Sequence, residues 1–357
     1  MGNIKITKSE TSKFDEIDWN NLGFGKYFGD HVYISDYKDG KWSEGEIVPY
    51  SDMSAEPALC TLHYGQTIFE GLKAFYSVDG GANIFRPDMN AKRLNVSAKT
   101  LCIPAYDEAR FLEACHDLVL LDRKFIPKEK GQSLYLRPLV YGTGNFLGVH
   151  TSDTYRMIIM SSPVASYYAE GLAPLKILVS DQYVRTVRGG LGAAKTAANY
   201  AASLLAGTKA KEQGFAQVLW LDGVSLDYVD EVGAMNIMFV IEDELITPPL
   251  WQGTLLAGVT RDTVLKLADE MRLKVSERQI RISEVFKAHN EGKLQEVFGT
   301  GTAAVISPVG LLSHKRVEIT INDFQIGPLA QKFYDVITSI QHGETKDERN
   351  WVMRVNF

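Results

Sequence analysis

A lysine among small residues is the first candidate for chemistry. Lys195 lies in the segment Arg185-Thr-Val-Arg-Gly-Gly-Leu-Gly-Ala-Ala-Lys195-Thr-Ala-Ala-Asn-Tyr200. Its three glycines allow the backbone to approach another group closely. Lys195 lies at the N-terminus of the Ala-rich helix expected after it, and this end of a helix is unfavourable for a cation. A lysine held there can act as an imine-forming amine. The alternative is a solvated surface lysine beside a flexible turn.

Two other segments could bind an anion. In Gly253-Thr-Leu-Leu-Ala-Gly258-Val-Thr260, the threonine occupies the expected N-cap of an amphipathic helix. Such an N-terminus offers free N–H groups to a phosphate. Phe298-Gly-Thr300-Gly-Thr302-Ala-Ala-Val alternates glycine and threonine before an apolar strand, so N–H and hydroxyl donors could surround an anion. The alternatives are a plain helix cap and a tight bend between strands.

One acidic residue is expected to point inward. Glu231, in Tyr228-Val-Asp-Glu231-Val-Gly, precedes a strongly apolar strand. A buried carboxylate needs a partner, which could be a protonated ring nitrogen or a structural Arg or Lys. Together, an amine, two anion-binding segments and a carboxylate are what pyridoxal phosphate requires. The amine suits its aldehyde, the anion-binding segments suit its phosphate, and the carboxylate suits its ring nitrogen.

The elements that must position these residues mix strands and helices. We predict strands over 31–35, 82–85, 133–138, 155–160, 175–180 and 217–221, and a hairpin over 235–241 and 244–247. We predict helices over 90–105, 108–124, 196–213 and 260–271. Without strict βαβ alternation, the pattern indicates an α/β (mixed α+β) protein with mixed sheets flanked by helices.

The segment Tyr168-Ala-Glu-Gly-Leu-Ala-Pro174 interrupts this pattern with small residues, Gly and Pro. We interpret 169–174 as an interdomain connection. It would join a smaller N-terminal domain, 1–168, to a larger C-terminal domain, 175–357, that carries Lys195. The alternative is an ordinary loop inside one domain.

Composition narrows the function class. The chain has 357 residues, 45% hydrophobic residues and a net charge of −6. These values exclude a disordered chain and argue against a nucleic-acid partner. No apolar run approaches the ~18 residues of a membrane span. Cys60, Cys102 and Cys115 are widely spaced, so we expect buried thiols in a reducing compartment and no zinc site. A cytoplasmic protein without a membrane or metal partner is expected.

The sequence resembles the branched-chain amino acid aminotransferases, which are pyridoxal-phosphate enzymes of fold type IV. The resemblance runs from Phe24-Gly to Pro308-Val. The blocks that carry it are His63-Tyr-Gly-Gln-Thr-Ile-Phe-Glu-Gly-Leu-Lys-Ala-Phe75, Phe85-Arg-Pro-Asp-Met-Asn-Ala-Lys-Arg93-Leu, Tyr135-Leu-Arg-Pro, Gly190-Leu-Gly-Ala-Ala-Lys195-Thr-Ala-Ala-Asn-Tyr200, Glu231-Val-Gly-Ala-Met-Asn and Leu256-Ala-Gly-Val-Thr.

The resemblance implies two domains with pyridoxal 5′-phosphate at the domain interface. Lys195 would bind the cofactor covalently and shuttle a proton, Tyr200 on the same helix face would bond the ring hydroxyl, and Glu231 would pair with the ring nitrogen. Arg185 would join the phosphate or ring environment. The phosphate would be held by Arg93, Val259, Thr260 and Thr302.

The resemblance also implies a substrate pocket and a homodimer. The pocket would be lined by Phe24, Tyr64, Phe69, Tyr135, Arg137, Tyr167, Ala234 and Ala303. A loop with Leu147 and Val149 would reach the neighbouring subunit's site. Two departures from the family stand out. Ala304 and Ser307 replace a Cys pair found in some relatives, and Ala234 replaces a threonine.

The implied activity is reversible transamination between L-leucine, L-isoleucine or L-valine and 2-oxoglutarate. Strand alternation would place Tyr135 and Arg137 on one face, where both could bind the second carboxylate of glutamate. The alternative for Arg137 is a structural ion pair. Rival functions are a D-amino acid aminotransferase, a 4-amino-4-deoxychorismate lyase, and a non-catalytic binding protein on the same scaffold. Retention of Lys195, Tyr200 and Glu231 argues against the last.

Overall fold

The structure is a computed structural model that describes residues 4–166 and 172–357. The chain divides into two compact units. Unit 1 comprises Met1–Ala169, Ala194–Ala197 and Thr338–Phe357, and unit 2 comprises Glu170–Ala193 and Ala198–Ile337. This division differs from the expected domains, because Lys195 and the C-terminal segment belong to unit 1, which is the larger unit. The connection expected at 169–174 begins on residues outside those described.

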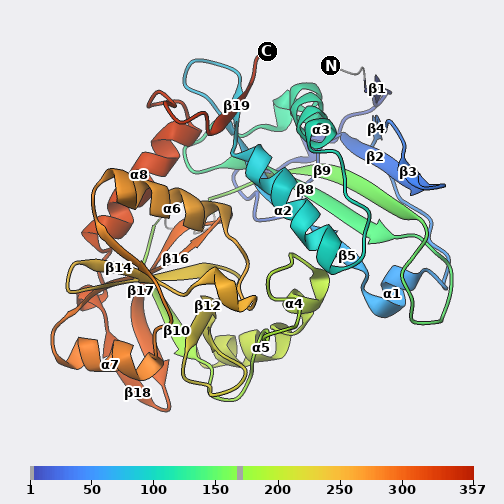
Figure 1. Cartoon of the computed structure of the whole chain (residues 1–357). Helices are drawn as coiled ribbons and strands as arrows, with labels where there is room; N and C mark the ends of the chain where they lie inside the picture. Colours follow the sequence, from blue (N-terminus) through green and yellow to red (C-terminus); the bar gives the residue numbers. More distant parts are fainter. Residues whose placement is uncertain (1–3, 167–171) are drawn as a thin grey trace. The chain divides into compact units, whose positions relative to one another are not determined.

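Unit 1 is built on one sheet with the strand order β1-β4-β2-β9-β8-β6-β7-β19, with β3 paired to β2 and β5 to β8 (Figure 1). Its strands are β1 (Lys5–Ile6), β2 (His31–Lys38), β3 (Lys41–Trp42), β4 (Glu46–Pro49), β5 (Thr67–Phe69), β6 (Leu72–Tyr76), β7 (Ala82–Phe85), β8 (Ser133–Gly142), β9 (Tyr155–Val164) and β19 (Val352–Val355). Its helices are η1 (Phe14–Glu16), α1 (Cys60–Tyr64), α2 (Pro87–Thr100), α3 (Glu108–Leu121) and η2 (Arg123–Phe125).

The core of unit 1 follows from two sequence periods. Along β8, Leu134 and Leu136 enter the core, so the residues between and after them face the other side of the sheet. Along α3, the residues with helical spacing face the same core, and α3 packs against α2. The Asp107 carboxylate accepts the Arg110 N–H at 2.7 Å and caps α3. The predicted helix 108–124 is confirmed as α3 followed by η2.

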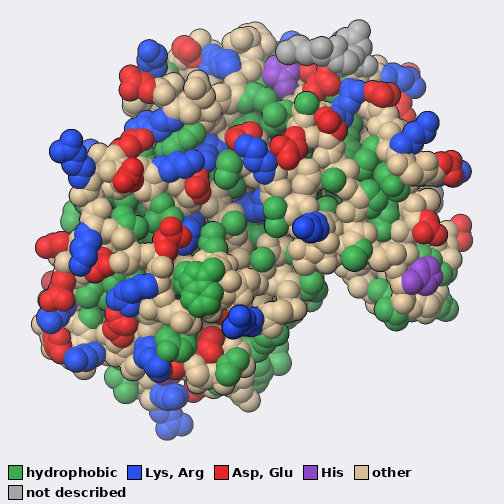
Figure 2. Space-filling view, viewed as in Figure 1, with side chains coloured by type: hydrophobic (Ala, Val, Ile, Leu, Met, Phe, Trp, Pro, Cys, Tyr) green, Lys and Arg blue, Asp and Glu red, His purple; other side chains and the backbone are tan. Residues whose placement is uncertain are grey.

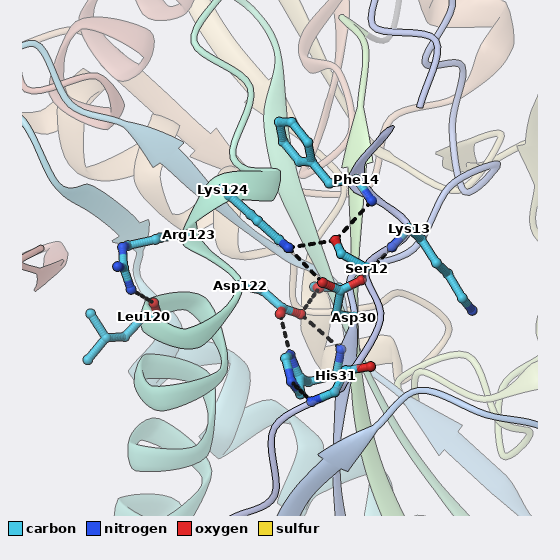
Figure 3. Close-up of polar contacts among 11 residues, drawn as sticks. Ser12, Lys13, Phe14, Asp30, His31, Leu120, Asp122, Arg123 and Lys124 are labelled. Atoms are coloured by element: carbon cyan, nitrogen blue, oxygen red, sulfur yellow. Dashed lines mark hydrogen bonds and ion pairs between the residues drawn. The ribbon is translucent and has the colours of Figure 1, made fainter. Parts of the chain in front are cut away.

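A buried acid–histidine pair ties the start of unit 1 to its helices (Figure 3). The Asp122 carboxylate lies 2.6 Å from Nδ1 of His31 and also accepts the His31 main-chain N–H at 3.2 Å. Nε2 of His31 accepts the Ser9 N–H at 2.9 Å. Next to this pair, Asp30 accepts the Lys13 N–H at 2.9 Å and forms an ion pair with Lys124 at 2.9 Å. These bonds hold the N-terminal segment against α3 and η2.

Unit 2 is built on a second mixed sheet with the strand order β12-β11-β10-β17-β16-β13-β14-β15, with β18 paired to β17. Its strands are β10 (Leu175–Val179), β11 (Gln217–Leu221), β12 (Val229–Val232), β13 (Asn236–Ile241), β14 (Glu244–Thr247), β15 (Lys274–Glu277), β16 (Leu294–Gly301), β17 (Val305–His314) and β18 (Val317–Thr320). Its helices are α4 (Ala197–Ala201), α5 (Leu204–Glu212), η3 (Leu250–Gln252), α6 (Val259–Glu270), α7 (Ile282–Asn290), η4 (Asn322–Phe324) and α8 (Pro328–Gln341), of which α4 begins and α8 ends in unit 1.

Packing in unit 2 explains its unbroken apolar strands. Every residue of β13 is buried, as expected for a central strand. Helix α5 packs against β11, and α6 and α7 pack against β16. In the described part of the chain, no helix is both long and apolar enough to cross a membrane.

Four sequence expectations need correction. The predicted helix 196–213 is two helices, because the N–H and hydroxyl of Ser203 both bond the Tyr200 carbonyl, at 3.1 and 2.7 Å. Helix α4 begins at Ala197, so Lys195 precedes it and does not share a helix face with Tyr200. Thr260 is the second residue of α6, whose N-cap is Gly258. Cys102 is exposed rather than buried, since it lies in the turn after α2 at φ 54°.

Candidate active site

The backbone around Lys195 is fixed by two elements of unit 1. The Phe69 N–H of β5 donates to the Lys195 carbonyl at 2.9 Å, and the Lys195 N–H donates to Oγ of Ser97 on α2 at 2.9 Å. Oγ1 of Thr196 donates to the Thr67 carbonyl at 2.7 Å. Three hydrogen bonds to these partners leave the lysine backbone little freedom.

The Lys195 amine lies over an aromatic ring, in a half-buried setting. Nζ is 4.7 Å from the ring centroid of Phe69. Burial, and next the positive charge of Arg93, lower the pKa of Lys195 to about 8, while Glu70 opposes the shift. A fraction of the amine is therefore neutral near physiological pH. The lysine is not the solvated surface residue of the alternative interpretation.

Glu70 is a site residue that sequence analysis missed. It is fully buried, and its two carboxylate oxygens accept Nε and Nη2 of Arg93 at 2.8 and 2.7 Å. Asn90 donates to the same carboxylate at 2.7 Å. Burial would raise the pKa of Glu70, but Arg93 and then Lys195 hold it below its ordinary value. The sequence signal that could have identified Glu70 is an acidic residue inside the largely apolar run 67–75. The phosphate role of Arg93 stays a prediction.

The sheet face beside Lys195 carries an arginine and two aromatic rings. Nη2 of Arg137 donates to the Tyr135 hydroxyl at 3.1 Å, which confirms that both point to one face. The guanidinium carbon lies 4.8 Å from the ring centroid of Phe69, and the ring of Phe24 meets that of Tyr135 at 5.0 Å. Nε of Arg137 is buried and lacks a hydrogen-bond partner among the described residues. The structure thus gives Arg137 no ion pair with any described carboxylate.

A glycine makes room for the tyrosine. A Cβ atom on Gly71 would lie 2.0 Å from the Tyr135 hydroxyl and 2.9 Å from Cζ of its ring. Such contacts are far inside van der Waals distance, so any side chain at this position would displace Tyr135. The lack of a side chain at Gly71 therefore leaves room for the tyrosine hydroxyl at the place where Arg137 donates to it.

Other predicted pocket residues of unit 1 lie at its surface. Tyr64 on α1 donates its hydroxyl to the Leu147 carbonyl. Leu147 is 68% exposed and Val149 is 87% exposed. Tyr167 lies outside the described residues.

In unit 2, Glu231 forms a buried ion pair. Nη1 of Arg185 lies 2.7 Å from its Oε2, and Nδ2 of Asn236 donates to its Oε1 at 3.0 Å. The guanidinium of Arg185 lies 5.6 Å from the ring centroid of Tyr200. Arg185 is thus a partner of the buried Glu231 carboxylate, and the ring-nitrogen role of Glu231 stays a prediction. Within unit 2, Arg185 thus contacts Glu231 and Tyr200, which are expected around a cofactor ring. Neither of these contacts is to the N-terminus of α6, where the phosphate is expected. Oε1 of Glu231 also accepts the Leu256 N–H at 3.3 Å.

Asp230 is a second buried acid next to Glu231 that sequence analysis did not single out. Its carboxylate accepts Oγ1 of Thr254 at 3.2 Å. Burial, followed by the charge of Glu231, raises the pKa of Asp230 to about 7. Asp230 therefore titrates near neutral pH.

The two expected anion-binding segments keep donors that suit an anion. The N-cap of α6, Gly258, supplies no side chain, and a Cβ there would lie 2.0 Å from Oδ1 of Asn236. Oγ1 of Thr300 is buried without a hydrogen-bond partner within the described ranges. The N–H groups of a helix N-terminus and an unsatisfied hydroxyl both favour an anion. Among the other predicted residues of unit 2, Val259 and Thr260 are buried, Thr302 and Ala303 are half-buried, and Ala234 is exposed.

Comparisons with known proteins agree on one family. The model for amino-transferase class IV matches residues 67–312. "Branched-chain-amino-acid aminotransferase 2" of Bacillus subtilis (strain 168) is 49% identical over 99% of this chain and 97% of its own length.

Two solved structures are similar in fold. The Escherichia coli branched-chain amino acid aminotransferase has a TM-score of 0.75 at 28% identity, covering 92% of this chain and 99% of that one. The branched-chain amino acid aminotransferase from Thermobaculum terrenum in its PLP form has a TM-score of 0.75 at 24% identity, with coverage of 92% and 99%. The fold class predicted from the sequence is confirmed, and the chain belongs to the class IV aminotransferases, among the branched-chain-amino-acid aminotransferases.

Proposed function

We propose that the protein transfers the amino group of L-leucine, L-isoleucine or L-valine to 2-oxoglutarate, reversibly, with pyridoxal 5′-phosphate as cofactor. The products are the branched-chain 2-oxo acid and L-glutamate. The observation that carries this proposal is the sheet face of unit 1. There the Lys195 amine and the Arg137 guanidinium lie over the same Phe69 ring, at 4.7 and 4.8 Å from its centroid.

The residues fit pyridoxal phosphate. Lys195 has the lowered pKa that an imine-forming amine needs, and the unpartnered Thr300 hydroxyl and the α6 N-terminus, which has no side-chain cap, suit a phosphate. Lys195 would hold the aldehyde carbon, Tyr200 the ring hydroxyl and Glu231 the ring nitrogen, with Arg185 behind Glu231. The phosphate would be held by Arg93, Val259, Thr260 and Thr302. When bound, the cofactor withdraws electrons from the substrate Cα.

Lys195 is the proton carrier in this proposal. Its Nζ removes the proton from the substrate Cα and returns it on the cofactor side, which requires an amine that can be both neutral and protonated near pH 7. Burial and Arg93 supply that balance by lowering its pKa. Glu231, which forms an ion pair with Arg185, would pair with the ring nitrogen and keep it protonated.

Dual substrate specificity follows from the same face. An aliphatic side chain would contact Phe24, Phe69 and the ring of Tyr135. The second carboxylate of glutamate would accept hydrogen bonds from the Arg137 guanidinium and the Tyr135 hydroxyl, since an apolar wall alone would leave that charge unpaired. Ala234 and Ala303 complete the proposed pocket, and Tyr167 is retained as a prediction.

We also propose a homodimer. Tyr64 fixes the Leu147 carbonyl, and the exposed side chains of Leu147 and Val149 would reach the partner's site. Apolar side chains with such exposure gain stability when a partner covers them. The three free cysteines, Cys60, Cys102 and Cys115, support a cytoplasmic location.

The test is an absorbance titration of the cofactor-loaded protein. L-leucine alone should convert the bound cofactor to its amino form, and 2-oxoglutarate should then restore the original spectrum. D-leucine should leave the spectrum unchanged, which separates this activity from that of a D-amino acid aminotransferase. A spectrum that L-leucine does not change would overturn the proposal.

A further inference from the structure

A hollow in unit 2 is lined by none of the residues proposed to hold the cofactor. It has a volume of about 430 Å³, and its walls come from the end of β10 and the following loop, from α5, and from the turn between β17 and β18. Neither Arg185, Tyr200 and Glu231 nor the expected phosphate ligands line it. Its size is in the range of sites for small molecules.

Positive charge gathers at this hollow. Lys209 on α5 and Lys315 and Arg316 in the β17–β18 turn line it, against one acid, Asp181. Within the described ranges, none of these three cations lies within ion-pair distance of a carboxylate. Figure 2 shows basic side chains at the edge of unit 2 where Figure 1 labels β18. An excess of about two positive charges in a protein of net charge −6 favours an anion at this place.

Lys315 and Arg316 occupy turn positions that are unfavourable for residues with long side chains. His314 pairs with Val317, so Lys315 and Arg316 form a two-residue connection. Their φ angles are 49° and 68°, both in the left-handed region. Hairpins of this kind favour Asn-Gly, because long L-residues are strained there. Strained residues that persist often serve a site.

The floor and the loop give the hollow a defined shape. Leu178, Ala206 and Val218 supply apolar surface between α5 and the sheet. The Tyr183 N–H donates to Oγ of Ser180 at 3.0 Å, which closes the loop after β10. The Lys209 ammonium lies 4.9 Å from the ring centroid of Tyr183 and donates to its hydroxyl. One cation is thus held in place at the wall.

We propose that this hollow binds a small organic dianion, either a dicarboxylate or a phosphate ester. The three cations would bind its charged groups, and the apolar floor would contact its carbon skeleton. The proposal does not depend on the chemistry proposed for Lys195.

The test is calorimetric titration of the cofactor-loaded protein with malonate and, separately, with inorganic phosphate, at constant ionic strength. The variants are K209Q and the double variant K315N/R316G. The control is K211Q, which removes a charge from the same helix at a residue that does not line the hollow. The double variant installs the favoured turn sequence, so its melting temperature without ligand should not fall.

We expect saturable binding by the wild type and by K211Q. Binding should be at least about threefold weaker in K209Q and weaker still in K315N/R316G, as expected for exposed charge pairs. Tighter binding of malonate would identify a dicarboxylate site, and tighter binding of phosphate a phosphate-ester site. Equal affinity in all four proteins, or no saturable binding of either anion, would overturn the proposal.

Discussion

Replacing Arg137 by methionine should separate the two half-reactions. R137M keeps an unbranched side chain that reaches about as far as Nε but removes the guanidinium that lies over Phe69 and donates to Tyr135. Leucine needs only apolar contacts from this face, whereas 2-oxoglutarate brings a second carboxylate. The half-reaction with 2-oxoglutarate should therefore suffer, and the half-reaction with leucine should change little.

The magnitude follows from the charge-assisted hydrogen bond that R137M removes. Arg137 forms no ion pair with a described carboxylate, so a substrate carboxylate at its guanidinium would gain a charge-assisted hydrogen bond. Such a bond is worth ~1.5–3 kcal/mol, which corresponds to roughly 10-fold to 150-fold in rate. Since R137M also removes an unsatisfied buried N–H, it should not lower the free energy of unfolding greatly.

The assay is a single-turnover stopped-flow measurement of each half-reaction. R156M is the matched control, because Arg156 on β9 of the same sheet forms an exposed ion pair with Asp36. That variant should leave both half-reactions unchanged and cost at most ~1 kcal/mol of stability. If R137M slowed both half-reactions equally, Arg137 would serve the fold or the cofactor, and the reasoning would be refuted.

Three further variants test other parts of the account. G71A places a Cβ 2.0 Å from the Tyr135 hydroxyl, so single-turnover rates with 2-oxoglutarate should fall by roughly 3-fold to 10-fold, the worth of one hydrogen bond, while rates with leucine fall less. D230N should become more stable than the wild type as pH rises. The reason is that Asp230 keeps its proton up to about pH 7 in the folded protein, whereas it loses the proton near pH 3.8 in the unfolded chain, and the asparagine has no such cost. Urea unfolding should show no gain below about pH 4 and a gain of up to roughly 4 kcal/mol above pH 7, and a pH-independent difference would contradict the assignment. E231Q removes the charge opposite Arg185, so kcat should drop by ~10-fold or more with a smaller change in KM; an unchanged kcat would place the essential carboxylate elsewhere.

Features governed by local periodicity were predictable from the sequence. Tyr135 and Arg137 share a face because side chains alternate along a strand. The helix 108–124 was recognisable from its apolar spacing. Glu231 was expected to be buried because apolar residues surround it, and it is 3% exposed.

Features that depend on distant partners were not predictable. Glu70 and Arg93 are 23 residues apart and meet only because β5 and α2 pack together. The grouping of Lys195 with unit 1 depends on hydrogen bonds to β5 and α2, which no local pattern encodes. The break between α4 and α5 arises from the Ser203 side chain, which competes for a backbone carbonyl.

Transfer of labelled nitrogen from leucine to 2-oxoglutarate is the reaction that defines the proposed transaminase. The cofactor-loaded protein is incubated with 15N-labelled L-leucine and 2-oxoglutarate, and the products are measured by mass spectrometry. We expect 15N-labelled L-glutamate and the 2-oxo acid of leucine in equal amounts. The K195A variant should give neither product while keeping its far-UV circular dichroism. Release of the label as ammonia, or undiminished labelled glutamate from K195A, would contradict the account.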